Sequence, residues 1–149
     1  MVTSIKRYVP VLSIILLGFA ILMAPAMPAS AASRGLTASC SFVSTTRLQC
    51  NLPILTANYN AEIHYVSMQC TGAVVAFTLQ QFQILAIPPN DTSDVAYQVA
   101  GNRASVAGVV NSAEIVSIHV KANTTPSALI DLAPAPMGTN CTVSISATF

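Results

Sequence analysis

Apolar and polar residues alternate along much of the chain that follows residue 31, and this alternation constrains the fold more than any other feature. In the segment 141–149 every second residue is apolar, and the residues between are Ser or Thr. The segment 114–121 has the same pattern, with Val116, Ile118 and Val120 on one face. A period of two places apolar side chains on one face of an extended strand. We therefore expect half-buried β-strands and no helix in this part of the chain.

Short runs of this kind recur between turn residues. We expect strands at 37–44, 48–55, 63–70, 74–87, 95–99, 104–110, 114–121 and 141–149. The first two should form a hairpin through 45–47, and Gly101-Asn102-Arg103 should turn the chain. Within 74–87 the apolar phase changes at Gln80-Gln81, which predicts a β-bulge or a break into two strands. Seven or eight short strands predict an all-β, antiparallel β-sandwich, either immunoglobulin-like or jelly-roll.

The first 31 residues have the features of a secretory signal helix. Lys6 and Arg7 precede an apolar run at 9–23, and Ala29-Ser30-Ala31 supplies an A-x-A cleavage site. The run is shorter than the ~20 residues of a spanning helix. We expect cleavage after Ala31, leaving a single domain at 32–149 that lacks a membrane span and is exported to the periplasm, cell surface or medium.

Ionisable residues are scarce in the predicted domain, with four basic and five acidic side chains after residue 31. Such a balance offers no basic surface for nucleic acid or anionic membrane. The surface must therefore be solvated mainly by Ser, Thr, Asn and Gln. We expect no nucleic-acid partner.

The four cysteines all lie after residue 31, and an even count in a small exported chain predicts two disulfides with three possible pairings. We favour Cys40–Cys50, which would staple a local hairpin, and Cys70–Cys141, which would tie the last strand to the middle of the chain. A zinc site is the alternative, but no C-x-x-C spacing is present.

Glu62 and His64 are two residues apart, so they share a face if the segment 61–70 is extended. His119 lies on the polar face of another predicted strand. If the two strands are neighbours, these three side chains could bind a metal or carry out acid–base chemistry. The simpler interpretation is an exposed polar patch.

The loop 88–94 contains the oxygen-bearing side chains Asn90, Asp91 and Asp94. Clustered oxygen ligands can hold Ca²⁺. The alternative is ordinary turn chemistry, because Asn and Asp bond to their own backbone and the loop lacks the spacing of an EF-hand. We expect no metal and no cofactor, with calcium as the alternative.

Motifs of common catalytic sites are missing from the sequence. It contains no G-x-S-x-G, no H-E-x-x-H and no glycine-rich phosphate loop. The sequence therefore assigns no catalytic residue.

Two segments resemble those of a loose group of small exported bacterial proteins of unknown function. Residues 63–70 read IHYVSMQC, an aliphatic strand with Val-Ser before a cysteine, and residues 141–146 read CTVSIS near the end of the chain. The resemblance spans most of the chain from Leu48 to Phe149. It implies a β-sandwich and supports pairing Cys70 with Cys141, but it implies no activity.

Taken together, these features predict an exported, non-catalytic binding or interaction module. Its partner would be a protein or a glycan, bound by the loops 88–94 and 133–140. A structural subunit of a surface fibre or coat is one alternative. A secreted hydrolase that uses His64 or His119 is the other.

Overall fold

The computed structural model describes residues 33–72, 76–134 and 138–149. They lie in the compact unit Ala31–Phe149, whereas the predicted signal peptide, residues 1–31, lies outside the described residues. Within those ranges the chain forms strands, turns and loops. No helix among them is long and apolar enough to cross a membrane.

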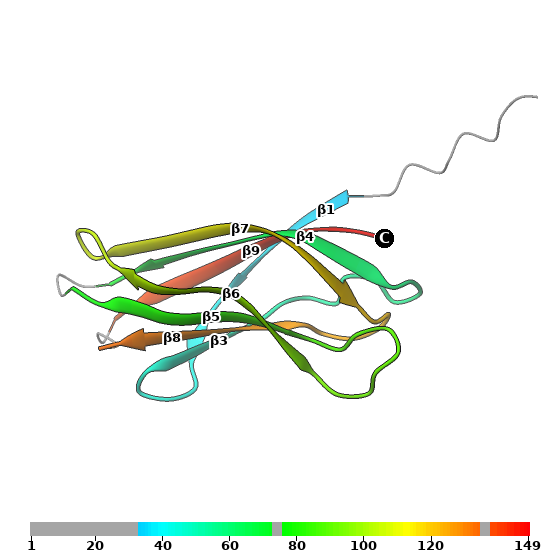
Figure 1. Ribbon diagram of the computed structural model, residues 1–149, viewed down its shortest axis with the longest axis horizontal. Coiled ribbons are helices and arrows are strands. Elements are labelled where there is room, and N and C mark those ends of the chain that lie inside the picture. Colours follow the sequence, from blue (N-terminus) through cyan, green and yellow to red (C-terminus); the bar gives the residue numbers. More distant parts are fainter. Residues whose placement is uncertain (1–32, 73–75, 135–137) are drawn as a thin grey trace, which may run out of the picture. The chain divides into compact units, whose positions relative to one another are not determined.

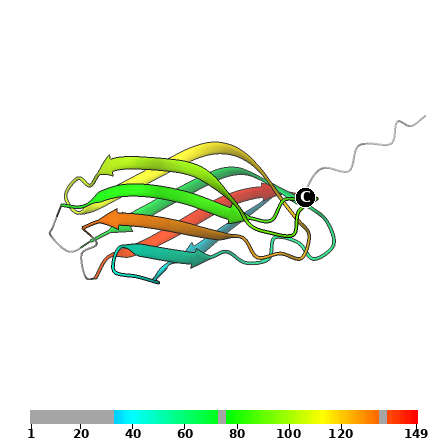
Figure 2. The ribbon, with the colours of Figure 1, turned by 60° about the horizontal axis from the view of Figure 1, so that its bottom comes forward.

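In the described ranges, nine strands form two antiparallel sheets that stack as two layers (Figures 1 and 2). One sheet has the order β1-β9-β4-β7 and the other the order β2-β3-β8-β5-β6. The strands are β1 (Ser33–Ser39), β2 (Ser41–Phe42), β3 (Arg47–Asn51), β4 (Ala61–Thr71), β5 (Thr78–Ala86), β6 (Val95–Ala104), β7 (Val109–Val120), β8 (Ser127–Ala133) and β9 (Asn140–Thr148). The predicted antiparallel β-sandwich is confirmed.

The strand pairing is nested like one long hairpin that has been rolled up. β5 pairs with β6 at the tip, and outward from it β4 pairs with β7, β3 with β8, and β1 with β9. Pairing of β4 with β9 joins two of these pairs into the four-stranded sheet, and pairing of β5 with β8 joins the other two into the five-stranded sheet. In the immunoglobulin order the first two strands are neighbours, whereas here the first pairs with the last. The topology is therefore the jelly roll.

The core lies between the sheets and is filled by alternate side chains of both. Its largest fully buried members are Phe77, Phe82, Leu48, Leu52, Ile63, Leu79, Ile84, Ile130, Leu132, Val66, Val120 and Val143. Val120 belongs to the expected inward face of β7, and Val143 to that of β9. Burial of these side chains supplies the main stabilising free energy of the sandwich.

Two disulfides form with the favoured pairing, one within the four-stranded sheet and one between the two sheets. Cys70 and Cys141 are direct register partners on β4 and β9, and both face the core. Cys40 lies where the chain leaves the four-stranded sheet after β1, and its disulfide to Cys50 ties this point to β3 of the other sheet.

Four predictions about the strands were wrong. The run 37–44 is divided between β1 and β2, which lie in different sheets, so only its end forms the expected hairpin with β3. Gly101-Asn102-Arg103 lies inside β6, and the chain turns at 105–108 instead. The expected strand 104–110 is therefore not a strand of its own, and its last residues belong with 114–120 to the single strand β7. The fourth error is β8, a strand between two others in its sheet that was not expected from the sequence.

The phase change at Gln80-Gln81 is a β-bulge inside a single strand, one of the two predicted alternatives. Leu79 pairs with Leu132 and Gln81 with Asp131, so Gln80 is the extra residue. The bulge lets Leu79 and Phe82 both face the core despite their opposite parity.

Candidate binding face of the four-stranded sheet

The outward side chains of the four-stranded sheet line up in rows across β9, β4 and β7. The strand register sets three successive rows, namely Thr142, Gln69 and Asn111, then Ser144, Ser67 and Ala113, then Ser146, Tyr65 and Ile115. Neighbouring strands lie ~4.8 Å apart, so the members of a row are close neighbours. We call this surface the outer face.

A hollow of about 300 Å³ lies on the outer face. Its lining consists of Ser67, Met68, Gln69, Asn111, Ser112, Ala113, Thr142 and Ser144. Its lining includes the small side chains of Ser67, Ala113 and Ser144, which form one row. No lining residue is ionisable, so the hollow is neutral and polar.

A bulge in β4 brings Tyr65 onto the outer face. Relative to β9, the step from Ile63 to Tyr65 spans two residues of β4 but one of its partner. Ile63 and Val66 both face the core as a result, and His64 and Tyr65 both point outward. Tyr65 is 41% exposed, and its register partner Ile115 is 89% exposed. The two form an apolar pair beside the hollow.

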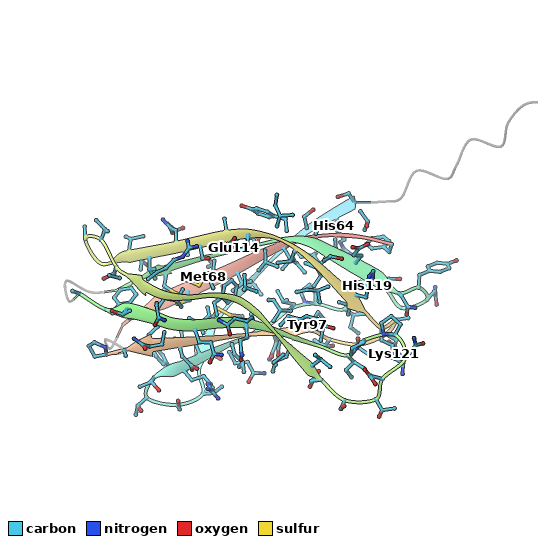
Figure 3. All side chains as sticks on the ribbon, viewed as in Figure 1. His64, Met68, Tyr97, Glu114, His119 and Lys121 are labelled. Atoms are coloured by element: carbon cyan, nitrogen blue, oxygen red, sulfur yellow. A yellow bond between two sulfur atoms is a disulfide. The ribbon has the colours of Figure 1, made fainter. Side chains whose placement is uncertain are left out.

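The structure brings together the predicted polar patch of Glu62, His64 and His119. Glu62 is the register partner of His119 because β4 and β7 are neighbours, and Figure 3 shows both histidines near one end of the four-stranded sheet. The Glu62 Oε1 atom lies 3.7 Å from His64 Nδ1 and accepts a 2.6 Å hydrogen bond from Ser117 Oγ. On its other side, His64 Nε2 shares a 2.5 Å hydrogen bond with Thr148 Oγ1.

The surroundings of Glu62 favour its charged form. The hydrogen bond from Ser117 holds the pKa of Glu62 below its ordinary value, and positive charge on His64 and His119 acts in the same direction, against the opposing effect of desolvation. No group of three or more His, Cys, Asp or Glu side chains is placed to share a metal ion within the described ranges. The patch contains two separate hydrogen bonds, Ser117 to Glu62 and His64 with Thr148, and a longer contact between His64 and Glu62.

The two predicted binding loops do not form one site. The loop 88–94 follows the end of β5, whereas the loop 133–140, of which residues 135–137 lie outside the described ranges, begins opposite the start of β5. In the first loop the backbone N–H of Asp91 donates to the carbonyl of Pro88, which is the hydrogen bond of a β-turn over 88–91. Lys121 Nζ also donates a 2.9 Å hydrogen bond to the backbone carbonyl oxygen of Asp91, so one oxygen of this loop already binds an ammonium group.

The residues of the hollow were missed at the level of sequence. Ser67, Gln69, Asn111 and Ser144 were assigned only to solvation, because their types are common on exposed strand faces. The one sequence signal was the outward parity of these positions. Only the strand register shows that the small residues coincide in one row.

Comparisons with known proteins give only distant likeness. No protein-family model matches the sequence, and no curated protein matches it. Among solved structures, the chain is similar to a subunit of the T13 particle of infectious bursal disease virus (13% identity, TM-score 0.46, 80% of this chain and 31% of that one). It is also similar to the cyanophage Pam1 capsid asymmetric unit (14% identity, TM-score 0.44, 85% of this chain and 91% of that one).

The Gx strain of infectious bursal disease virus gives a similar match (13% identity, TM-score 0.48, 80% of this chain and 32% of that one). This chain thus spans about a third of the length of the first two structures it matches. At this level of similarity the matches carry no information about its function.

Proposed function

We propose that this protein is an exported, non-catalytic binding module that recognises its partner on the outer face of the four-stranded sheet. The observation that carries the proposal is the neutral hollow with the exposed pair Tyr65 and Ile115 beside it. Concavity, exposed apolar side chains and polar groups held in fixed positions are features of recognition sites.

Two features support export. The first 31 residues have the charge, apolar run and cleavage pattern of a secretory signal. Two disulfides join all four cysteines, and disulfides persist mainly in oxidising compartments.

The outer face is a better candidate than the predicted loops. It is built on rigid, register-locked strands, so its polar groups are held in fixed positions without the ordering cost of a loop. The loops 88–94 and 133–140 lie at opposite ends of β5 and cannot act on one small ligand.

The test compares two substitutions of matched type. Asn111→Arg places a long cation at the hollow, whereas Asn51→Arg places the same side chain at an exposed strand position of the five-stranded sheet. Each exported protein is immobilised and exposed to a cell-envelope extract of its own host, and retained molecules are identified by mass spectrometry. We expect the wild type and Asn51→Arg to retain the same identified partner, and Asn111→Arg to lose it.

Equal retention by both variants would show that the partner binds elsewhere. No retention by any form, including the wild type, would contradict the assignment as a binding module. Oligomers that form through the outer face and are lost in Asn111→Arg would instead favour the structural-subunit alternative.

One contact favours a second candidate function, a secreted hydrolase. Thr148, His64 and Glu62 follow the hydroxyl–imidazole–carboxylate order of a catalytic triad. However, the 3.7 Å separation of His64 and Glu62 is longer than a hydrogen bond, and Ser117 already occupies the carboxylate. A fluorophosphonate probe that labels Thr148 in the wild type but not in His64→Ala would support this function, and an unlabelled wild type would contradict it.

A further inference from the structure

We propose that the hollow on the outer face binds a neutral oligosaccharide of β-linked pyranose units, with one sugar stacked against Tyr65. The inference rests on the proposed function, because it names the ligand class of the same face.

The hydrogen-bonding groups of the lining match those of a sugar. The outward side chains are the hydroxyls of Ser67, Thr142 and Ser144 and the amides of Gln69 and Asn111. Hydroxyl and amide groups both donate and accept hydrogen bonds, as sugar hydroxyls do. With no ionisable side chain in the lining, an anionic ligand would have no cation to pair with, whereas a neutral polyol needs none.

The two amides of the lining stand side by side. Gln69 on β4 and Asn111 on β7 are direct register partners, so their side chains stand next to each other at one wall of the hollow. Each amide carries both hydrogen-bond donors and an acceptor. This arrangement suits a pair of neighbouring hydroxyls on one ring.

The apolar pair Tyr65 and Ile115 lies beside the hollow, outside its lining. Tyr65 lies four residues before Gln69 on the same strand, or about 13 Å away at ~3.3 Å per residue. Its exposed ring, extended by Ile115, offers an apolar surface. A pyranose whose hydroxyls are all equatorial has apolar C–H faces, so one unit of an oligosaccharide can stack on this ring while another unit, further along the strand, reaches the amides.

Titration of the exported, ¹⁵N-labelled protein with cellohexaose, chitohexaose and the anionic polygalacturonate tests the ligand class. We expect at least one neutral hexaose to shift the amide signals of Ser67, Gln69, Asn111 and Ser144 saturably, and polygalacturonate to leave them unchanged. Tyr65→Ala should weaken binding at least tenfold, while Tyr59→Ala, which removes a more exposed ring outside the hollow, should leave it unchanged. Tyr65→Phe retains the ring and should bind within a few-fold of wild type, which separates loss of stacking from loss of folding.

A matched amide pair completes the test. Gln69→Ala should weaken binding of the hexaose, and Gln83→Ala, on β5 of the other sheet, should not. Signal changes that map outside the hollow, or equal binding of polygalacturonate, would overturn the inference. Shifts in the hollow that depend on protein concentration without sugar would overturn it too, by showing that a second copy of the chain occupies the face.

The two experiments distinguish an error in the ligand class from an error in the binding face. If neither neutral hexaose shifts the hollow signals but Asn111→Arg still loses an identified envelope partner, the sugar is wrong and the binding face stands. If Asn111→Arg loses no partner and no hexaose binds, both are wrong.

Discussion

Within the described part of the chain, the Ser112 side chain conflicts with its surroundings. It is 2% exposed, and its Oγ atom has no hydrogen-bond partner among the described residues. Its position on β7 has the inward parity of Val110, where an apolar side chain fits. A buried hydroxyl without a partner costs ~1–3 kcal/mol relative to an apolar group.

We therefore expect Ser112→Ala to raise the free energy of unfolding by about 1 kcal/mol. Urea unfolding monitored by circular dichroism measures the change, with Ser67→Ala, an outward hydroxyl on β4, as a control close to zero. A loss of stability in Ser112→Ala would mean that the hydroxyl is bonded in solution.

Glu62 gives a prediction at the same scale, because its pKa is lowered mainly by the hydrogen bond from Ser117. A carboxyl with a lowered folded-state pKa contributes stability that is present above the unfolded-state pKa and lost as the pH falls through the folded-state pKa. We expect Ser117→Ala to move the pKa of Glu62 upward toward its ordinary 4.5 and to make unfolding less pH-dependent below that value. Carboxyl ¹³C titration measures the pKa of Glu62 directly, and an unchanged value in Ser117→Ala would mean that the hydrogen bond is not formed.

Among the strands, the bulge of β5 requires a glycine at the neighbouring position of β6, Gly101. A Cβ atom at Gly101 would lie 2.9 Å from the backbone oxygen of Gln80, the extra residue of the bulge. Backbone cannot move aside as a flexible side chain can. We expect Gly101→Ala to destabilise the fold by ~1–3 kcal/mol.

Gly35→Ala is the matched control for this prediction. A Cβ atom at Gly35, in β1, would meet no other part of the described chain within 4 Å, and the backbone there is not left-handed. Replacing this glycine should be neutral, or stabilising by less than ~1 kcal/mol through lower entropy of the unfolded chain. Thermal unfolding of both variants measures the difference, and equal melting temperatures would contradict the close approach of Gly101 to Gln80.

The same bulges explain which strands sequence reasoning could predict. In β5 large apolar residues stand on both sides of Gln80, so the phase change is visible in the sequence. In β4 the bulge lies among His64 and Tyr65, which are plausible on either face, and it left no signal. Gly101-Asn102 was mistaken for a turn because glycine is common in turns, whereas here it accommodates the bulge of the neighbouring strand.

The candidate site was predictable only in part for a related reason. The parity of β4 and β7 placed Glu62, His64 and His119 on outward faces, but alternation does not reveal which strands are neighbours. The hollow depends on that missing information, since Ser67, Ala113 and Ser144 come from three strands and meet only through the register.

For the whole molecule, the jelly-roll pairing joins strands that are far apart in the chain, and the disulfide between β4 and β9 stabilises one of these long-range contacts. Its cysteines are 71 residues apart, compared with 10 for Cys40 and Cys50. A crosslink lowers the entropy of the unfolded chain more when it closes a longer loop.

We therefore expect the double variant of Cys70 and Cys141 to alanine to be the less stable of the two disulfide variants. The loop-entropy relation gives a loss of ~4.4 kcal/mol for the long loop and ~3 kcal/mol for the loop between Cys40 and Cys50. Guanidinium unfolding of both double variants, with the fully reduced wild type as the lower limit, measures the two losses. If the short-loop variant were the less stable, anchoring the crossing from β1 to β3 would matter more than the loop closed, and the stability of the sandwich would depend mainly on keeping its two sheets joined at Cys40.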